Sequence, residues 1–178
     1  MEVLRRAEPH TRRHDAVVLE EMLRGELEVD RYVEDSAFEF PLFARRSATL
    51  MRALVRDGVA VEQVEPFFEV LSDVHDQVSA GIKPHELPDG TALRAVYDAE
   101  RAWTEALLPY YWVAGDRPFD DVVAAVVRFA RADAARGTLR DAMRADALVP
   151  LLARHPRLYV EAGYLHLPLR TRLRELLP

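Results

Sequence analysis

The chain of 178 residues contains no cysteine. This absence excludes a disulfide framework, a thiolate zinc site and a cysteine nucleophile, and it fits a reducing cytosol. No apolar run approaches the roughly 18 residues of a membrane span, and the first residues lack the apolar segment of a signal peptide. We therefore expect a cytoplasmic protein with no membrane partner.

Positive charge is also scarce. The net charge is −6, from 24 basic and 30 acidic residues, and Lys83 is the only lysine. An acidic chain without a basic stripe is a poor binder of duplex nucleic acid. The nearest thing to a basic cluster, Arg170, Arg172 and Arg174, alternates with leucines and is typical of the solvated face of a terminal helix. We expect no nucleic-acid partner.

Four short segments predict β-strands, because they are rich in β-branched or aromatic residues and are bounded by residues that break regular structure. These segments are residues 3–8, 29–34, 59–65 and 157–161. Apolar residues at helical spacing, with proline or glycine at several ends, predict helices between and after them. The helical segments are residues 12–24, 41–57, 66–80, 91–108, 118–136, 138–154 and 165–177.

Alternation of strands and helices is typical of βαβ units. The sequence therefore predicts an α/β fold, with a small parallel sheet of about four strands flanked by helices. Residues 82–156 would form a mostly helical insertion between strands three and four, and the length suits one domain over residues 1–178. An all-helical bundle is the alternative, because the first two strands are short and carry charged residues.

Each of the four predicted strands ends on a carboxylate, at the edge where parallel sheets bind ligands. The carboxylates are Glu8, Glu34, Glu65 and Glu161, and His10 and His166 lie close to the first and last of them. Carboxylates and imidazoles together supply metal ligands or an acid–base pair. Glu65 equally suits a helix entry, since Pro66 follows it and negative charge is favourable there.

Two of these segments resemble a known superfamily. Glu8-Pro9-His10-Thr11 is similar to the Gly-Glu-x-His opening of the erythromycin esterases, the ChaN-like haem-binding proteins and the TIKI-type metalloproteases, and residues 158–168 resemble their closing motif. The resemblance implies a site lined by Glu8, His10, Glu34 and His166, and it carries Glu161 by position. Ala7 departs from the family glycine, and the middle of the chain is short.

Two functions follow as alternatives. In a hydrolase, Glu8 would act as general base, His10 and His166 would orient water or stabilise charge, and Glu34 would fix a histidine tautomer or bind metal. A metal would take Glu8, His10, Glu161 and His166 as ligands. The other alternative is a non-catalytic ligand-binding or scaffold protein. The expected partner is a small-molecule substrate or ligand, and the cofactor candidates are a divalent metal and haem.

Other motifs are less informative. Glycine-rich phosphate loops, Gly-x-Ser-x-Gly and His-Glu-x-x-His are all missing, which removes their usual signals. His75 on a helix and His85 in a proline-rich loop are expected to be packed or solvated. Residues 110–113 would form an exposed apolar patch unless covered, and such patches often mark interfaces, so homo-oligomerisation stays open.

Overall fold

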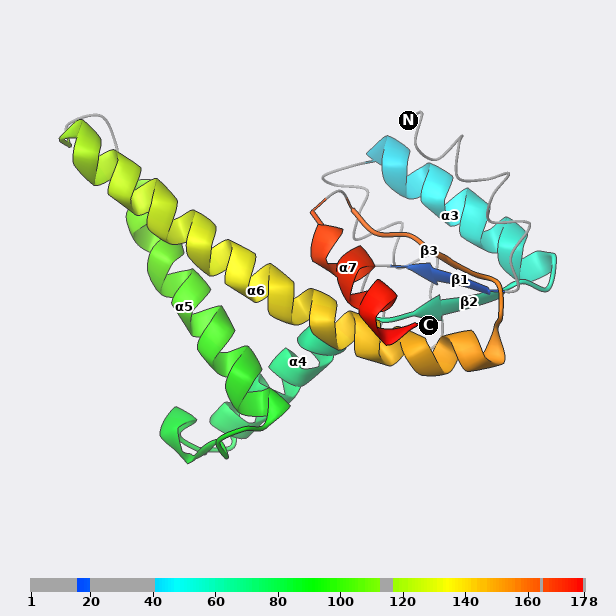
Figure 1. Cartoon of the computed structure of the whole chain (residues 1–178), viewed down its shortest axis with the longest axis horizontal. Helices are drawn as coiled ribbons and strands as arrows, with labels where there is room; N and C mark the ends of the chain where they lie inside the picture. Colours follow the sequence, from blue (N-terminus) through cyan, green and yellow to red (C-terminus); the bar gives the residue numbers. More distant parts are fainter. Residues whose placement is uncertain (1–15, 20–40, 113–116, 164, 178) are drawn as a thin grey trace. The chain divides into compact units, whose positions relative to one another are not determined.

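A computed structural model describes residues 16–19, 41–112, 117–163 and 165–177 (Figure 1). In chain order the elements are β1 (Ala16–Leu19), α3 (Pro41–Arg56), β2 (Ala60–Gln63), α4 (Pro66–Ser79), a 3-10 turn (Pro84–Glu86), α5 (Ala92–Trp112), α6 (Phe119–Arg154), β3 (Leu158–Val160) and α7 (Leu167–Leu176). The chain forms two compact units, Met1–Glu65 with Ala147–Tyr164 and Pro66–Asp146 with Leu165–Pro178. The expectation of one domain stays a prediction.

The α/β fold class predicted from the sequence is wrong. Helices hold most of the described residues, and the strands are only three or four residues long. In the second unit, Val74 of α4 and Val96 and Ala106 of α5 are buried, and α4 packs against α5 with no strand among the described residues of that unit. The description of the chain as an α/β, hydrolase-like protein is corrected with it.

The strands of the first unit pair in parallel, in the order β2-β1-β3. Val17 of β1 is paired with Val61 of β2 and Tyr159 of β3. The prediction of a helix over residues 12–24 is wrong for Ala16–Leu19, which form β1. A short apolar run fits both a helix and a buried strand, and pairing on two sides decides for the strand.

Two of the four predicted strands can be compared with the structure. The predicted segments 59–65 and 157–161 contain β2 and β3. The segments 3–8 and 29–34 lie outside the described residues. A small core lies beside the strands, where the buried Met51 and Leu54 of α3 pack against neighbours from β2 and β3.

α3 ends where the sequence predicts, at a glycine. Gly58 has a φ of 75°, which glycine adopts without the steric cost that other residues incur. Its N–H donates to the carbonyl of Val55 (3.1 Å), and the N–H of Val59 donates to that of Leu54 (2.9 Å). This is the Schellman pattern of a helix C-terminus. The chain is thereby turned from α3 directly into β2.

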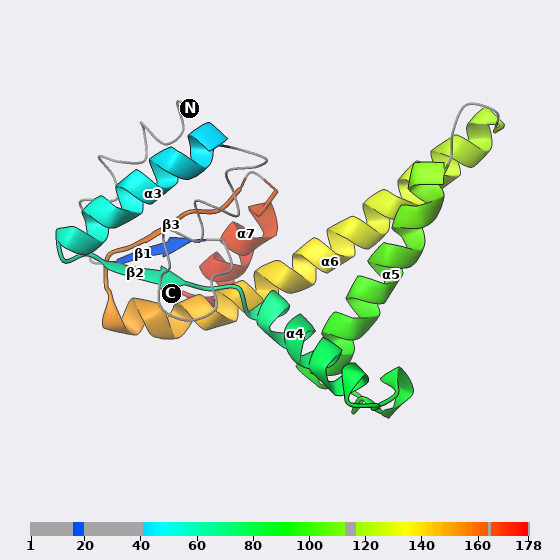
Figure 2. The same cartoon turned by 180° about the vertical axis from the view of Figure 1, so that it is seen from behind.

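The second unit contains an antiparallel hairpin of α5 and the first part of α6 (Figures 1 and 2). Trp103 Nε1 donates to Asp133 Oδ1 (2.9 Å), and the Tyr110 ring stacks on Phe129 with centroids 4.7 Å apart. From Trp103 to Tyr110 along α5, the contacted residue of α6 moves back from Asp133 to Phe129, so the two helices run antiparallel. The guanidinium of Arg136 lies over the Trp103 ring and ties this pair of helices together.

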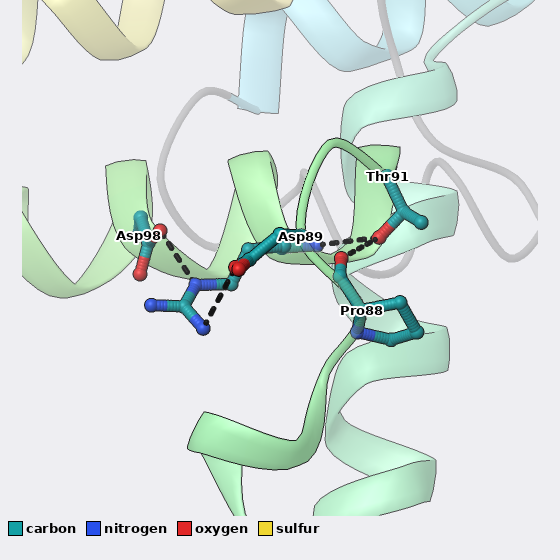
Figure 3. A network of polar contacts seen from close by, with 5 residues as sticks. Pro88, Asp89, Thr91 and Asp98 are labelled. Carbon is teal, nitrogen blue, oxygen red and sulfur yellow. Dashed lines mark hydrogen bonds and ion pairs between the residues drawn. The ribbon is translucent and has the colours of Figure 1, made fainter.

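α5 begins with a capped N-terminus (Figure 3). Thr91 Oγ1 accepts the Arg94 N–H (3.3 Å) and donates to the carbonyl of Pro88 (2.7 Å). A threonine before the first helical residue satisfies one of the four N–H groups that lack partners there. Arg94 then pairs with Asp98 one turn later (Nε to Oδ2, 2.7 Å) and approaches Asp89. The loop after α4 is thereby fixed to the hairpin.

Two helix ends predicted from the sequence are wrong. α5 continues through Pro109 to Trp112, and α6 continues through Gly137 as one helix of 36 residues. Arg136, next to Gly137, is held by Glu100 of α5 (Nε to Oε2, 2.6 Å). Such tertiary contacts outweigh the roughly 1 kcal/mol by which glycine disfavours a helix.

Long helices raise the question of membrane insertion. In the part of the chain that the structure describes, no helix combines enough length with enough apolar character to cross a bilayer.

Candidate functional site

The structure describes two of the five predicted site residues, His166 and Glu161. Glu8, His10 and Glu34 lie outside the described residues. Their convergence with His166 at one edge of the sheet therefore stays a prediction.

His166 immediately precedes α7, and its side chain is only 8% exposed. Its Nδ1 lies 2.5 Å from Oδ1 of Asp141, a residue of α6 whose side chain is 2% exposed. An ionised carboxylate can only accept hydrogen bonds, so Nδ1 carries the hydrogen and donates it. In the neutral ring this leaves Nε2 as the nitrogen with the lone pair.

The other oxygen of Asp141 holds the start of α7. Oδ2 accepts the backbone N–H of Leu169 at 3.0 Å, and both residues are buried. Leu169 is in the first turn of α7, where the N–H groups have no partner within the helix. The carboxylate also carries the charge that the N-terminal end of a helix favours. Asp141 therefore caps α7 from a different helix.

Arg144 follows Asp141 by one turn of α6 and is 1% exposed. Its Nη1 lies 3.4 Å from Nδ1 of His166. Because the Nδ1 hydrogen is directed at Asp141, this approach is a close contact and not a second hydrogen bond to that nitrogen. A buried cation this near the buried carboxylate along α6 offsets part of the cost of removing the carboxylate from water.

The Asp141 cluster, as we call Asp141, Arg144, His166 and the Leu169 N–H, has a structural explanation. An imidazole oriented by a carboxylate is also how enzymes hold a general base. Here the carboxylate has one oxygen on the ring and the other on the α7 backbone, and the ring is largely buried. The contacts assign His166 the task of positioning α7, while its predicted catalytic role stays a prediction.

The predicted metal site is only partly within the described residues. Among these, no group of three or more histidine, cysteine, aspartate or glutamate side chains is arranged to hold a metal ion. A site made with Glu8 and His10 stays a prediction.

Glu161 comes directly after β3, and it affects a nearby tyrosine. Burial raises the pKa of the Tyr159 hydroxyl above its usual value of 10, and the negative charge of Glu161 raises it further. The Tyr159 side chain also packs against Met51 and Leu54. At neutral pH this hydroxyl therefore stays protonated, as a neutral donor beside a carboxylate at the end of β3.

More than half of the exposed large hydrophobic side chains in the described residues lie on the α5–α6 hairpin. Fourteen large hydrophobic side chains are exposed in the described residues, and eight of them lie between Leu108 and Val127. We call these eight the hairpin surface: Leu108, Tyr110, Tyr111, Trp112, Phe119, Val123, Val126 and Val127. Tyr111 is 70% and Trp112 73% exposed. Contiguous apolar patches on a protein surface often mark interaction sites.

Sequence reasoning found only part of this surface. It singled out residues 110–113, of which 110–112 are described, and it missed the part on α6. A signal was present, because apolar residues occupy two faces of α6. Phe129 faces α5, whereas Val127 and Val123 lie about 160° and 120° away from it around the helix.

The histidines judged less informative are exposed. His75 lies on α4 beside an open groove of about 390 Å³ between α4 and α5. Arg101 and Glu105, also in its lining, are paired with each other (Nε to Oε1, 2.8 Å). His85 lies on the 3-10 turn. Neither histidine is part of the Asp141 cluster.

Comparison with known proteins gives one informative relative. An uncharacterised protein of Archaeoglobus fulgidus is 30% identical over 164 residues, which is 88% of this chain and 54% of that protein. The chain thus spans about half the length of the curated relative that it matches. No family model matches the chain. No solved structure matches it either. The resemblance to the erythromycin esterase superfamily stays a prediction.

Proposed function

We propose that the protein is a non-catalytic scaffold protein that binds another protein chain through its hairpin surface. The observation that carries this proposal is the concentration of exposed apolar side chains on α5 and α6, with three aromatic residues, Tyr111, Trp112 and Phe119, more than two-thirds exposed. Buried apolar contact is the main favourable contribution to most protein associations. Aromatic anchors are also enriched among the residues that contribute most to binding.

The polar residues support the same proposal. The buried pair Asp141 and His166 is engaged in capping α7, which is a structural task. The cytoplasmic location expected from the sequence is part of this proposal.

Site-specific crosslinking in living cells tests it. A photo-crosslinking amino acid in place of Tyr111 or Trp112 is expected to form a discrete adduct with another protein chain. The same amino acid in place of Val55, which is 53% exposed on α3, is the matched control and is expected to form none. Adducts of equal yield at all three positions, or adducts at none, would overturn the proposal.

A ligand panel tests this proposal against the metal- or haem-binding alternative. Zinc, manganese and haem are each added to the full chain, and thermal unfolding is followed. A ligand that binds the folded state raises the midpoint. We expect no shift with any of them. A reproducible rise with one would favour the ligand-binding alternative instead.

A further inference from the structure

The face of α6 turned away from α5 holds a shallow depression lined by three apolar and three charged residues. Its volume is about 490 Å³, and it is lined by Asp120, Val123, Ala124, Val127, Arg128 and Arg131. Val123 and Val127 are 42% and 41% exposed. The lining residues recur every three or four positions, so they share one face of the helix.

This face is distinct from the one that α5 covers. The contacts with α5 run through Phe129, Asp133 and Arg136. Val127 precedes Phe129 by two residues, which is about 200° around an α-helix. In the described part of the second unit, the depression is therefore a second apolar face on a helix that already has one helical partner.

The charges of this face are arranged with opposite signs at its two ends. Asp120 lies at one end, in the first turn of α6, and Arg131 lies at the other. The two are equally far from the point midway between Ala125 and Val126. So are Ala124 and Val127 near the centre of the face, and Val123 and Arg128, so a two-fold axis through that point would place Arg128 opposite a valine.

This arrangement is complementary to itself. A two-fold axis through the midpoint would place a second α6 antiparallel to the first, with Asp120 of each copy opposite Arg131 of the other. Two-fold interfaces use the same patch on both copies, so each favourable pair occurs twice. A parallel pairing would instead oppose like charges. Ala124, the smallest side chain in the lining, would allow the two helices to approach closely at the centre.

We propose that this face of α6 binds a second copy of the chain in the antiparallel orientation, an inference that rests on the proposed function. The contact covers about three helical turns. Together with the neighbouring exposed Phe119 it lies at the small end of specific interfaces. We therefore expect a reversible dimer with a micromolar Kd.

Charge exchange between two chains tests the orientation. Sedimentation equilibrium of the full chain is measured for wild type, Asp120→Arg, Arg131→Asp and an equimolar mixture of the two variants. Each variant alone opposes like charges at two places, so its Kd should rise about fivefold to thirtyfold. In the mixture, charges of opposite sign face each other again, and the association should return to the wild-type level.

Asp73→Arg is the matched control, because it makes the same charge change at an exposed position on α4. It should leave the Kd unchanged. Raising the salt concentration should weaken the wild-type dimer and narrow the differences between variants, since exposed charges are screened. Far-ultraviolet circular dichroism verifies that each variant is folded.

Several results would overturn the inference. One is a wild-type chain that stays monomeric to high micromolar concentration. Another is a dimer whose Kd responds to Asp73→Arg as much as to Asp120→Arg, or a mixture that fails to recover. If the chain is monomeric and crosslinks from Tyr111 or Trp112 reach a different protein, self-association fails while the proposed function stands. If crosslinks are also absent, both fail.

Discussion

Removing the Asp141 carboxylate should loosen α7 and destabilise the second unit. Asp141→Ala leaves two donors without their acceptor, the Nδ1–H of His166 and the buried N–H of Leu169. Each buried donor without a partner costs about 1–3 kcal/mol. We expect a loss of about 3 kcal/mol in the free energy of unfolding. Asp141→Asn should cost about 1 kcal/mol, because the amide oxygen can hold Leu169 while the ring changes tautomer.

Urea unfolding followed by tryptophan fluorescence measures this loss. Both tryptophans, Trp103 and Trp112, lie on α5 in the same unit as Asp141, so the signal reports the relevant part. Asp146→Ala is the matched control. It lies on the same helix, but its carboxylate is 61% exposed and 3.7 Å from Arg172. Exposed pairs of this kind contribute at most about 1 kcal/mol.

A double-mutant cycle isolates the contact between the ring and the carboxylate. Asp141→Ala, His166→Ala and the double variant should show a coupling of about 1–2 kcal/mol, because groups in direct contact are not additive. The reasoning is refuted if Asp141→Ala costs no more than Asp146→Ala, or if the coupling is zero within error. In that case the Asp141 cluster does not hold α7.

Three further predictions concern the backbone, one cation and one tyrosine. In urea unfolding, Gly137→Ala should stabilise by about 0.5–1 kcal/mol and Gly58→Ala should destabilise by about 1–2 kcal/mol; a Cβ meets nothing within 4 Å at either site, but Gly58 has a φ of 75°. Arg136→Lys should cost about 1–2 kcal/mol in the same assay, because it loses its planar contacts with rings and its Nε bond to Glu100. Tyr159 should ionise above pH 10 in an ultraviolet titration. Since its pKa is raised on folding, its contribution to stability is present below the unfolded pKa and is lost as pH rises through the folded one.

Local signals predicted the boundaries of two helices well. α3 and α4 each begin at a proline and end before a glycine, as expected. Gly81 has a φ of 97°, and its N–H donates to the carbonyl of Val78 (3.0 Å), which repeats the pattern at Gly58. Such ends depend on residues within one turn of each other, so the sequence contains the whole cause.

Helix ends that depend on distant contacts could not be predicted. Pro109 and Gly137 look like stops along the chain, yet both lie inside helices. Near Gly137, the ion pair of Arg136 with Glu100 joins residues 36 positions apart. The predicted α/β fold class was wrong for a related reason. In the second unit the apolar residues are buried among helices, and such contacts between distant helices have no local signal in the sequence.

The candidate site shows the same limit. The sequence singled out His166 but not Asp141, which lies 25 positions earlier on a helix. An aspartate within an arginine-rich and alanine-rich helix gives no local sign of burial, since most such carboxylates are solvated. Only the packing of α7 on α6 makes it a partner of the histidine.

A catalytic dyad and a capping contact use the same residue types. They differ in which hydrogen-bond donors the two carboxylate oxygens accept from. In the Asp141 cluster one carboxylate oxygen accepts from the ring and the other from the α7 backbone. Reactivity would require the ring to meet a substrate, but the ring is 8% exposed. Exposed hydrophobic side chains of the second unit gather on the hairpin surface, where Trp112 is 73% exposed. Both observations support the proposal that the protein associates with a partner through the hairpin surface.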